Sequence, residues 1–154
     1  MQYKFSPIKN KSELIEAVKY VATETSNMYA TIIGESPVIT SLTIFSHFDD
    51  EFDNLKQILA ELGNPYNENN GPRITLHEPI NVEGHSITHL RIRHPDQERP
   101  QVGCNDFDVK DYKEFEEKYL LPNSGVLHLI ERDEYNMIEF KHPDFPNVLG
   151  YVVS

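Results

Sequence analysis

The chain has little cysteine, few glycines and no long apolar run, and each shortage excludes a class of protein. Cys104 is the single cysteine of the 154 residues, so no disulfide can form within the chain and we expect the reducing cytoplasm. The seven glycines are scattered, and no Gly-x-Gly pattern exists that could form a phosphate-cradling loop. No apolar stretch approaches the length of a membrane span, and the N-terminus lacks the long apolar core of a secretory signal, so we expect no membrane partner.

Basic residues are also scarce. The chain has 14 lysines and arginines against 25 acidic residues, which gives a formal net charge of −11. Affinity for nucleic acid comes mainly from cations that displace counterions from phosphates. The best local basic patch, Arg91, Arg93, His94 and Arg99, is too small for such a footprint, so we expect no nucleic-acid partner.

Length and composition indicate a single globular domain. A domain of this size buries roughly 70% of its unfolded surface, so it needs no disulfide or structural metal to fold. The shares of apolar residues (38%) and charged residues (25%) are those of an ordinary soluble protein.

One sequence motif occurs twice in the chain. The triplets His94-Pro95-Asp96 and His142-Pro143-Asp144 each follow a run that alternates apolar and charged residues, Leu90–Arg93 and Ile138–Lys141, and each precedes a Pro-polar-Val step towards a glycine. Such an echo indicates one structural unit used twice. We therefore divide the domain into an N-terminal strand and helix extension (1–37), a first repeat unit (38–95) and a second repeat unit (96–154).

Hydrophobic periodicity predicts the elements of the first part. Apolar residues at three- and four-residue intervals predict a helix over Ser12–Met28, capped by Asn10 or Ser12, after an opening strand at Gln2–Ser6. The first unit then has a strand, an amphipathic helix that Gly63 ends, a polar loop and two strands. These lie at Val38–Phe45, Asp49–Leu62, Asn64–Pro72, Arg73–Glu78 and His85–Arg93.

The second unit repeats this order. A strand over Gln101–Val109 is followed by a helix that Asp108 can cap, and its buried stripe consists of Tyr112, Phe115, Tyr119 and Leu120. Three strands follow at Val126–Arg132, Met137–Lys141 and Val148–Val153. We predict an α+β fold in which two repeated βαββ(β) units form a curved, mostly antiparallel sheet, with helices on its outer face and an extra N-terminal helix.

This pattern resembles the vicinal oxygen chelate superfamily, the glyoxalase and bleomycin-resistance fold. The strand Thr40–Phe45 and the helix from Asp49 that ends in Leu62-Gly63 are similar to the opening of such modules, and His142–Asn147 is similar to the Asp-Pro-Asp-Gly-Asn turn before their last strand. The resemblance implies a ligand cavity inside a curved sheet. A ferredoxin-like duplication is the main rival, because it also repeats strands that flank helices.

The chain departs from the family at the metal ligands. Metal-dependent members place a His or Gln early in the first strand of a module and a Glu in the fourth. Here the first-strand positions hold Thr40–Leu42 and Val102–Cys104, and alignment of the two triplets sets Arg91 opposite Glu139. Only Glu139 is a metal-binding residue type, so the resemblance implies neither the usual metal site nor another cofactor.

Strand parity brings charged residues together. On the strand His85–Arg93, alternation puts His85, Ile87, His89, Arg91 and Arg93 on one face and Ser86, Thr88, Leu90 and Ile92 on the other. Met137, Glu139 and Lys141 share the corresponding face of the second unit, so we expect Arg91 and Glu139 at equivalent places across a pseudo-twofold axis. Arg91 could then bind an anion while Glu139 takes or gives a proton. The alternative is an ion pair between the two on a solvated sheet face.

The histidines leave a metal hypothesis open. His77, His89 and His128 fall in predicted strands. With Glu78, Glu131 or Glu139 they could form a two-His, one-carboxylate site. They lack close ligand spacing, however, which is more typical of structural histidines. Cys104 lies in an apolar strand without a catalytic signature, which is typical of a core residue.

These patterns favour one function and leave two others open. The favoured one is a metal-independent protein that binds a small, anionic molecule through His89, Arg91, Arg93 and Glu139, with Glu139 as the catalytic candidate. The first alternative is an isomerase, lyase or dioxygenase with a divalent metal on non-standard ligands. The second is an acidic, non-enzymatic module for a basic protein partner. Folds of this kind often pair modules, so a homodimer is also open, although no residue requires one.

Overall fold

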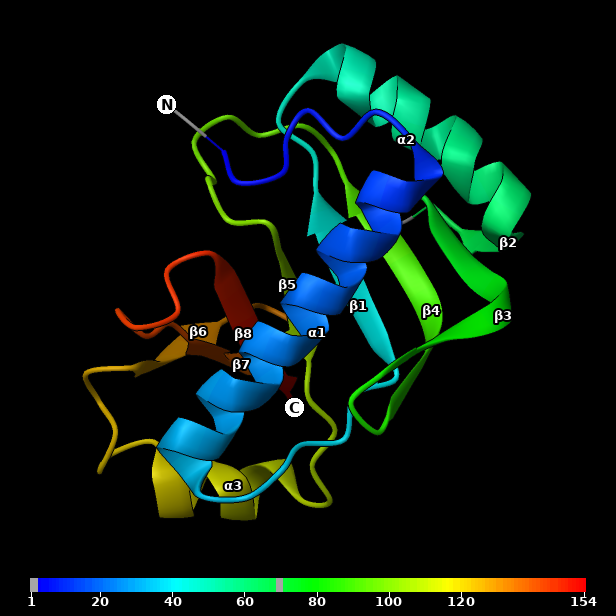
Figure 1. The fold of residues 1–154 in the computed structure, drawn as a ribbon. Helices are drawn as coiled ribbons and strands as arrows, with labels where there is room; N and C mark the ends of the chain where they lie inside the picture. The colour runs from blue at the N-terminus through cyan, green and yellow to red at the C-terminus, as the bar shows by residue number, and fades with distance from the viewer. Residues whose placement is uncertain (1–2, 69–70) are drawn as a thin grey trace.

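A single eight-stranded sheet forms the centre of the structure, a computed structural model in which residues 3–68 and 71–154 are described (Figure 1). Within these residues the elements are α1 (Lys11–Ile33), β1 (Ser41–Phe45), α2 (Asp49–Leu62), β2 (Gly63–Asn67), β3 (Arg73–Val82), β4 (His85–Arg93), β5 (Gly103–Asp106), α3 (Tyr112–Tyr119), β6 (Leu127–Glu131), β7 (Asn136–Phe140) and β8 (Val148–Val153). The strand order is β2-β3-β4-β1-β5-β8-β7-β6, so the sheet is open, with β2 and β6 at its edges. The predicted α+β fold is confirmed.

The two halves of the sheet have the same strand arrangement. In each half the first strand pairs in parallel with the last, β1 with β4 and β5 with β8, while the other strands pair antiparallel. The halves meet along β1 and β5, which are antiparallel, with Thr43 opposite Cys104. In this order β4 corresponds to β8, and β3 corresponds to β7. Descent of both halves from one duplicated unit stays a prediction.

The repeated His-Pro-Asp phrase does not mark equivalent positions in these halves. His94 follows β4, whereas His142 follows β7, which corresponds to β3. The expectation that Arg91 on β4 and Glu139 on β7 are related by a pseudo-twofold axis is therefore wrong. Any strand with one face in the core and one face outside alternates apolar and charged residues, so this pattern alone cannot distinguish the strands of a unit.

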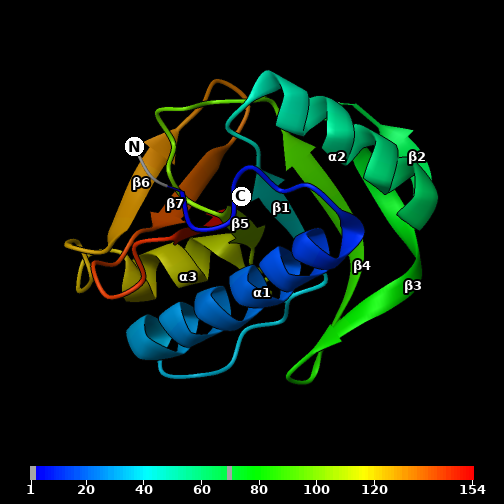
Figure 2. The same ribbon diagram turned by 45° about the horizontal axis from the view of Figure 1, so that its top comes forward.

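All three helices contribute to one hydrophobic core. Helix α1 lies across β1, β5 and β8, and α2 packs against β2, β3 and β4 (Figures 1 and 2). On α3, Phe115 packs against Phe140 of β7. The buried side chains of these helices belong to one cluster with Ile44, Leu90 and Ile138 from the facing side of the sheet. No helix within the described residues is long and apolar enough to cross a membrane.

Helix α1 begins as predicted and runs longer. The Asn10 side chain accepts a hydrogen bond from the Glu13 amide at 2.9 Å, which caps the helix. The helix continues past Met28 to Ile33 because Tyr29 is buried between the rings of Phe107 and Phe140, with centroid distances of 4.7 and 5.6 Å. It ends at Gly34, whose φ of 92° favours glycine.

Two predicted segments at the edges of the fold are different. Of the predicted opening strand, Gln2 lies outside the described residues, and residues 3–6 form no strand. Tyr3 stacks on His47 with ring centroids 4.0 Å apart, so this segment packs through its side chains instead. The predicted loop Asn64–Pro72 contains the edge strand β2, where Pro65 is tolerated because an edge strand leaves one side unpaired.

The second half differs from prediction mainly around its first strand. Strand β5 is shorter than the predicted Gln101–Val109, and α3 is capped by Asp111 instead of Asp108. The Asp111 carboxylate accepts a hydrogen bond from the Glu114 amide at 3.1 Å. Both aspartates are good capping residues, and the sequence alone does not choose between them.

The N-terminal segment is held to α2 by a buried carboxylate, which gives a test of the fold. Glu51 accepts hydrogen bonds from the amides of Ile8 (2.6 Å) and His47 (2.8 Å) and is 3% exposed. In Glu51→Ala both buried N–H groups lose their acceptor, so we expect the free energy of unfolding to fall by about 2–4 kcal/mol in urea denaturation. Asp53→Ala, an exposed change on the same helix, should alter it by less than about 0.5 kcal/mol. Equal effects of the two changes would contradict this role of Glu51.

Candidate functional site

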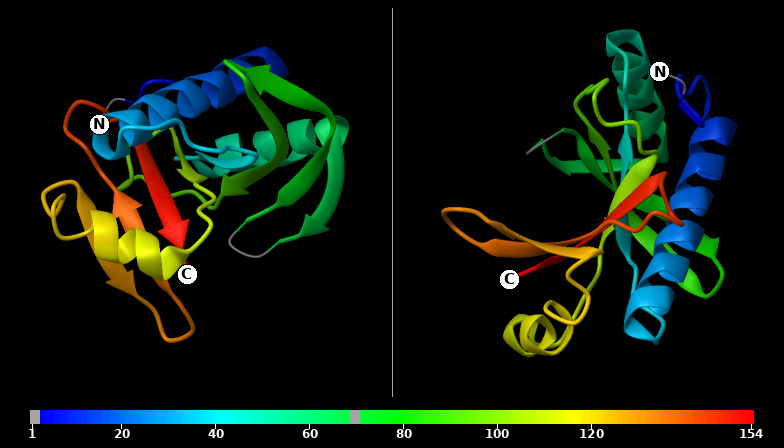
Figure 3. Two further views of the ribbon diagram at one scale, coloured as in Figure 1. Left: turned by 90° about the horizontal axis from the view of Figure 1, so that it is seen from below. Right: turned by 90° about the vertical axis from the view of Figure 1, so that its left-hand side faces the viewer.

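The face of the sheet away from the helices has a small apolar cluster of its own. Phe45, Cys104 and Leu149 are buried there, and Tyr151 packs against them. Within the described residues no helix contributes to this cluster. In the right-hand view of Figure 3, β6 and β7 project from the sheet on the side opposite to α1, so the curved sheet is concave on this face.

A hollow of about 690 Å³ lies over this cluster. Its lining includes all five arginines of the chain and none of its nine lysines. The arginines come from β3, β4, the β4–β5 connection and the residue after β6: Arg73, Arg91, Arg93, Arg99 and Arg132. Five guanidinium groups of a strongly acidic protein therefore converge on one concave surface.

Most of these arginines lack a carboxylate partner. Among the described residues, Arg91, Arg93 and Arg132 have no carboxylate oxygen within 4.0 Å, whereas Arg99 Nε lies 4.0 Å from Asp96 Oδ2. The Arg93 guanidinium instead lies 5.0 Å from the centre of the Phe45 ring. The Arg91 Nε atom is buried without a hydrogen-bond partner. Buried donors of this kind are normally satisfied, so this N–H is available to an acceptor on a ligand or to water.

The surroundings of Arg91 disfavour its charged form. Burial lowers the pKa of Arg91, and the like charges of Arg73 and Arg93 act in the same direction. Burial raises the pKa of Asp106 at the same place, against the opposing effect of Arg91 and Arg73. A bound anion would offset the repulsion among the three arginines, since an opposite charge favours the charged form.

On the wall of the hollow opposite β4, a hydrogen bond fixes the orientation of the Glu139 carboxylate. Tyr151 donates a hydrogen bond to Glu139 Oε2 at 3.0 Å, from β8 to β7. Burial raises the pKa of Tyr151 above its ordinary value, so the phenol stays protonated and keeps donating. The alternative of an ion pair between Arg91 and Glu139 is wrong, because no such pair forms among the described residues. Glu139 is held in place by Tyr151 and stays accessible from the hollow.

The predicted ligand-binding residues are partly brought together. Arg91, Arg93 and Glu139 line the hollow, whereas His89 does not and instead packs edge-on against Tyr66, with ring centroids 5.6 Å apart. The amides of residues 88 and 89 both bond to one carbonyl, that of Thr40, so β4 is irregular there. This irregularity breaks the alternation and places Ile87 in the core, 0% exposed, in place of the predicted charged face. Lys141 is exposed and outside the lining.

The proposed alternative metal ligands are not brought together. Within residues 3–68 and 71–154, no group of three or more His, Cys, Asp or Glu side chains could hold a metal ion. His77 lies beside Asn64 near the β2 edge, and His89 lies against Tyr66. Only His128 and Glu139 are neighbours, as a register pair between β6 and β7.

Sequence reasoning missed part of the arginine cluster. Arg73 is the first residue of β3 and pairs in register with Arg91, and Arg132 lies in the turn after β6. A strand prediction does place Arg73 on one face of the sheet. It cannot show that β3 and the β6–β7 turn lie on opposite sides of one hollow, because that depends on the curvature of the sheet. The one signal in the sequence is that both basic residues of the predicted strand His85–Arg93 are arginines.

Comparisons with known proteins identify the fold and nothing further. No family model and no curated protein matches the chain. A solved structure of a structural genomics protein, EC4020, is similar, with a TM-score of 0.63. The two chains are 12% identical, and the similarity covers 95% of this chain and 92% of the other. This likeness shows the fold alone.

The floor of the hollow gives a chemical test. Cys104 is 4% exposed, and burial raises the pKa of its thiol to about 11, so at pH 8 only about one molecule in a thousand carries the thiolate. We expect the native protein to react with a disulfide reagent at least roughly 100-fold more slowly than the urea-unfolded chain. The unfolded chain should titrate one thiol. Equally fast reaction of the native protein would show that the floor is open to solvent.

Proposed function

We propose that the protein binds a small anionic molecule in this hollow. The observation that carries the proposal is the convergence of all five arginines on one concave surface, where three of them have no carboxylate partner. A planar guanidinium offers paired donors that match a carboxylate or a phosphate, which an ammonium cannot do. The exclusion of every lysine from the lining fits recognition by such paired hydrogen bonds.

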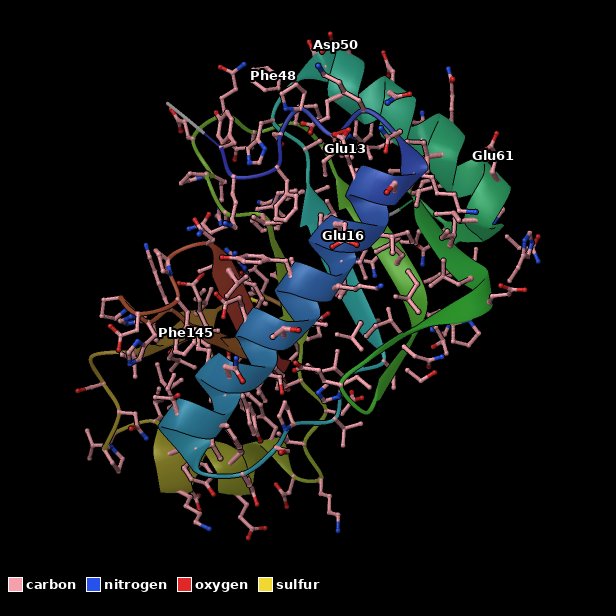
Figure 4. All side chains as sticks on the ribbon, viewed as in Figure 1. Glu13, Glu16, Phe48, Asp50, Glu61 and Phe145 are labelled. Atoms are coloured by element: carbon pink, nitrogen blue, oxygen red, sulfur yellow. The ribbon has the colours of Figure 1, made fainter. Side chains whose placement is uncertain are left out.

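The size of the hollow supports a small ligand. A volume of about 690 Å³ lies within the range of about 300–1,000 Å³ that is usual for small-molecule sites. The surroundings are acidic: in Figure 4, Glu13 and Glu16 lie on the outer side of α1, and Asp50 and Glu61 lie on α2. An anion that reaches the protein therefore meets attraction mainly in the hollow, because a cleft lined by one sign of charge focuses the field.

We further propose that the chain has the vicinal oxygen chelate type of fold without the usual metal site. Two halves of strand, helix and three strands, joined antiparallel through β1 and β5, support this assignment. In this proposal the hollow of the curved sheet keeps its role as a ligand site, and arginines take over the binding. Glu139, oriented by Tyr151, is the side chain that could move a proton on the bound molecule.

Titration with inorganic phosphate tests the binding. We expect the wild-type protein to bind phosphate in isothermal titration calorimetry at low ionic strength, and Arg91→Met to weaken binding by at least about 10-fold, because hydrogen bonds to charged groups contribute roughly 1.5–3 kcal/mol. Lys141→Met is the matched control: it removes the same charge from a nearby exposed position outside the lining. Absence of binding, or equal losses in both variants, would refute the proposal.

Although Arg91→Met should weaken phosphate binding, it should make the free protein more stable. Because burial and like charges disfavour the charged form of Arg91, its replacement by Met should raise the free energy of unfolding by about 1 kcal/mol in anion-free buffer. Phosphate should then raise the melting temperature of the wild type and leave that of Arg91→Met nearly unchanged. A destabilised variant in calorimetric or urea unfolding would indicate that Arg91 is instead satisfied within the protein.

A further inference from the structure

The hollow has two walls of different chemistry. One wall comes from β3, β4 and the connection that follows β4, and it contains four arginines and one carboxylate: Arg73, Arg91, Arg93, Arg99 and Asp96. The other wall comes from β6, β7, β8 and the β6–β7 turn, and its apolar and aromatic members are Ile130, Tyr135, Met137, Tyr151 and Val153. The charged members of this second wall are Arg132, in the turn after β6, and Glu139 on β7.

Strand register makes the apolar side chains of the second wall continuous. Ile130 pairs with Met137 across β6 and β7, and Met137 pairs with Val153 across β7 and β8. Directly opposite residues on one sheet face have Cβ atoms within about 5.5 Å, so the three side chains form an unbroken row. The next row inward holds the Tyr151–Glu139 pair.

The apolar wall is partly open to solvent. Val153 and Tyr135 are each 41% exposed, and Ile130 and Met137 are half-buried. Single exposed apolar residues are normal on a protein surface. A continuous apolar row on a concave surface that faces several cations instead indicates a binding surface. Apolar surface in a pocket with a few convergent polar groups is typical of a site whose ligand has both kinds of surface.

We infer that the ligand is an amphipathic anion with a single charged head. Its carboxylate or phosphate head lies against Arg91 and Arg93, and an aromatic or short aliphatic body covers the row Ile130–Met137–Val153. A second anionic group on the body is disfavoured, because Glu139 stands beside that row. This inference rests on the proposed function and names the substrate class of the same hollow.

The test compares inorganic phosphate, phenyl phosphate, hexyl phosphate and phenol by calorimetry. We expect phenyl phosphate or hexyl phosphate to bind at least about tenfold more tightly than inorganic phosphate, since burial of their bodies adds apolar contact. Phenol, which lacks the head, should show no measurable binding at the same concentrations. A phosphate affinity equal to that of both esters overturns the inference and leaves the proposed function intact. Absence of binding by every phosphate overturns both.

Variants of the apolar wall locate the contact. Val153→Asn should reduce the advantage of the better ester over inorganic phosphate at least about fivefold, and Met137→Gln should act in the same direction. Neither change should alter the affinity for inorganic phosphate by more than about twofold. Val38→Asn is the matched control, because Val38 is 59% exposed and lies outside the lining. An unchanged ester advantage in both wall variants, with their melting temperatures near that of the wild type, overturns the inference.

Discussion

The antiparallel contact between β1 and β5 is the constraint on which the rest of the structure depends. It is the join between the two halves of the sheet, and Thr43 opposite Cys104 fixes its register. Because sheet faces alternate, this register also decides which residues of both halves face α1 and which face the hollow. Ile44 and Asn105 face the helix side, where Asn105 bonds to Thr25 of α1, while Phe45 and Cys104 face away. A shift by one residue would put the floor of the hollow into the core.

The arginines that line the hollow lower the stability of the folded state, and the hydrophobic core must offset this loss. Arg91 loses hydration, lacks a partner for its Nε atom and lies near the like charges of Arg73 and Arg93. Unpaired buried charge is among the few causes of large losses in stability. The continuous cluster under α1, α2 and α3 provides the opposing term, since apolar burial is the main favourable contribution to folding. In the proposed function, a bound anion would offset this cost, because an opposite charge favours the charged form of Arg91.

The sequence alone predicts the element order well and the site only in part. Helix α2 and strand β8 could be placed to the residue, because amphipathic periodicity and turn residues agree at their ends. Strand β2 could not, because Asn64–Asn67 contains residues that are rare in strands and pairs only at an edge. Parity brought Arg91 and Glu139 to one face, but His89, in the same register as Arg91, lies outside the hollow, and an irregularity in β4 put Ile87 into the core. Such irregularities depend on tertiary pairing, which local patterns do not contain.

Charge segregation connects the composition to the site. A net charge of −11 would by itself predict a protein that repels anions, but all five arginines line the hollow and no lysine does, so the basic charge is concentrated there. Lysines have compact, strongly hydrated charges and are found here outside the hollow, whereas arginines, which are more weakly hydrated, accept the partly dry concave face. In the proposed function, the acidic exterior repels anions elsewhere on the surface, so that attraction is confined to the hollow. In the proposed function, selectivity for an anion thus depends on two separate sets of residues, the arginines of the hollow and the acidic residues outside it.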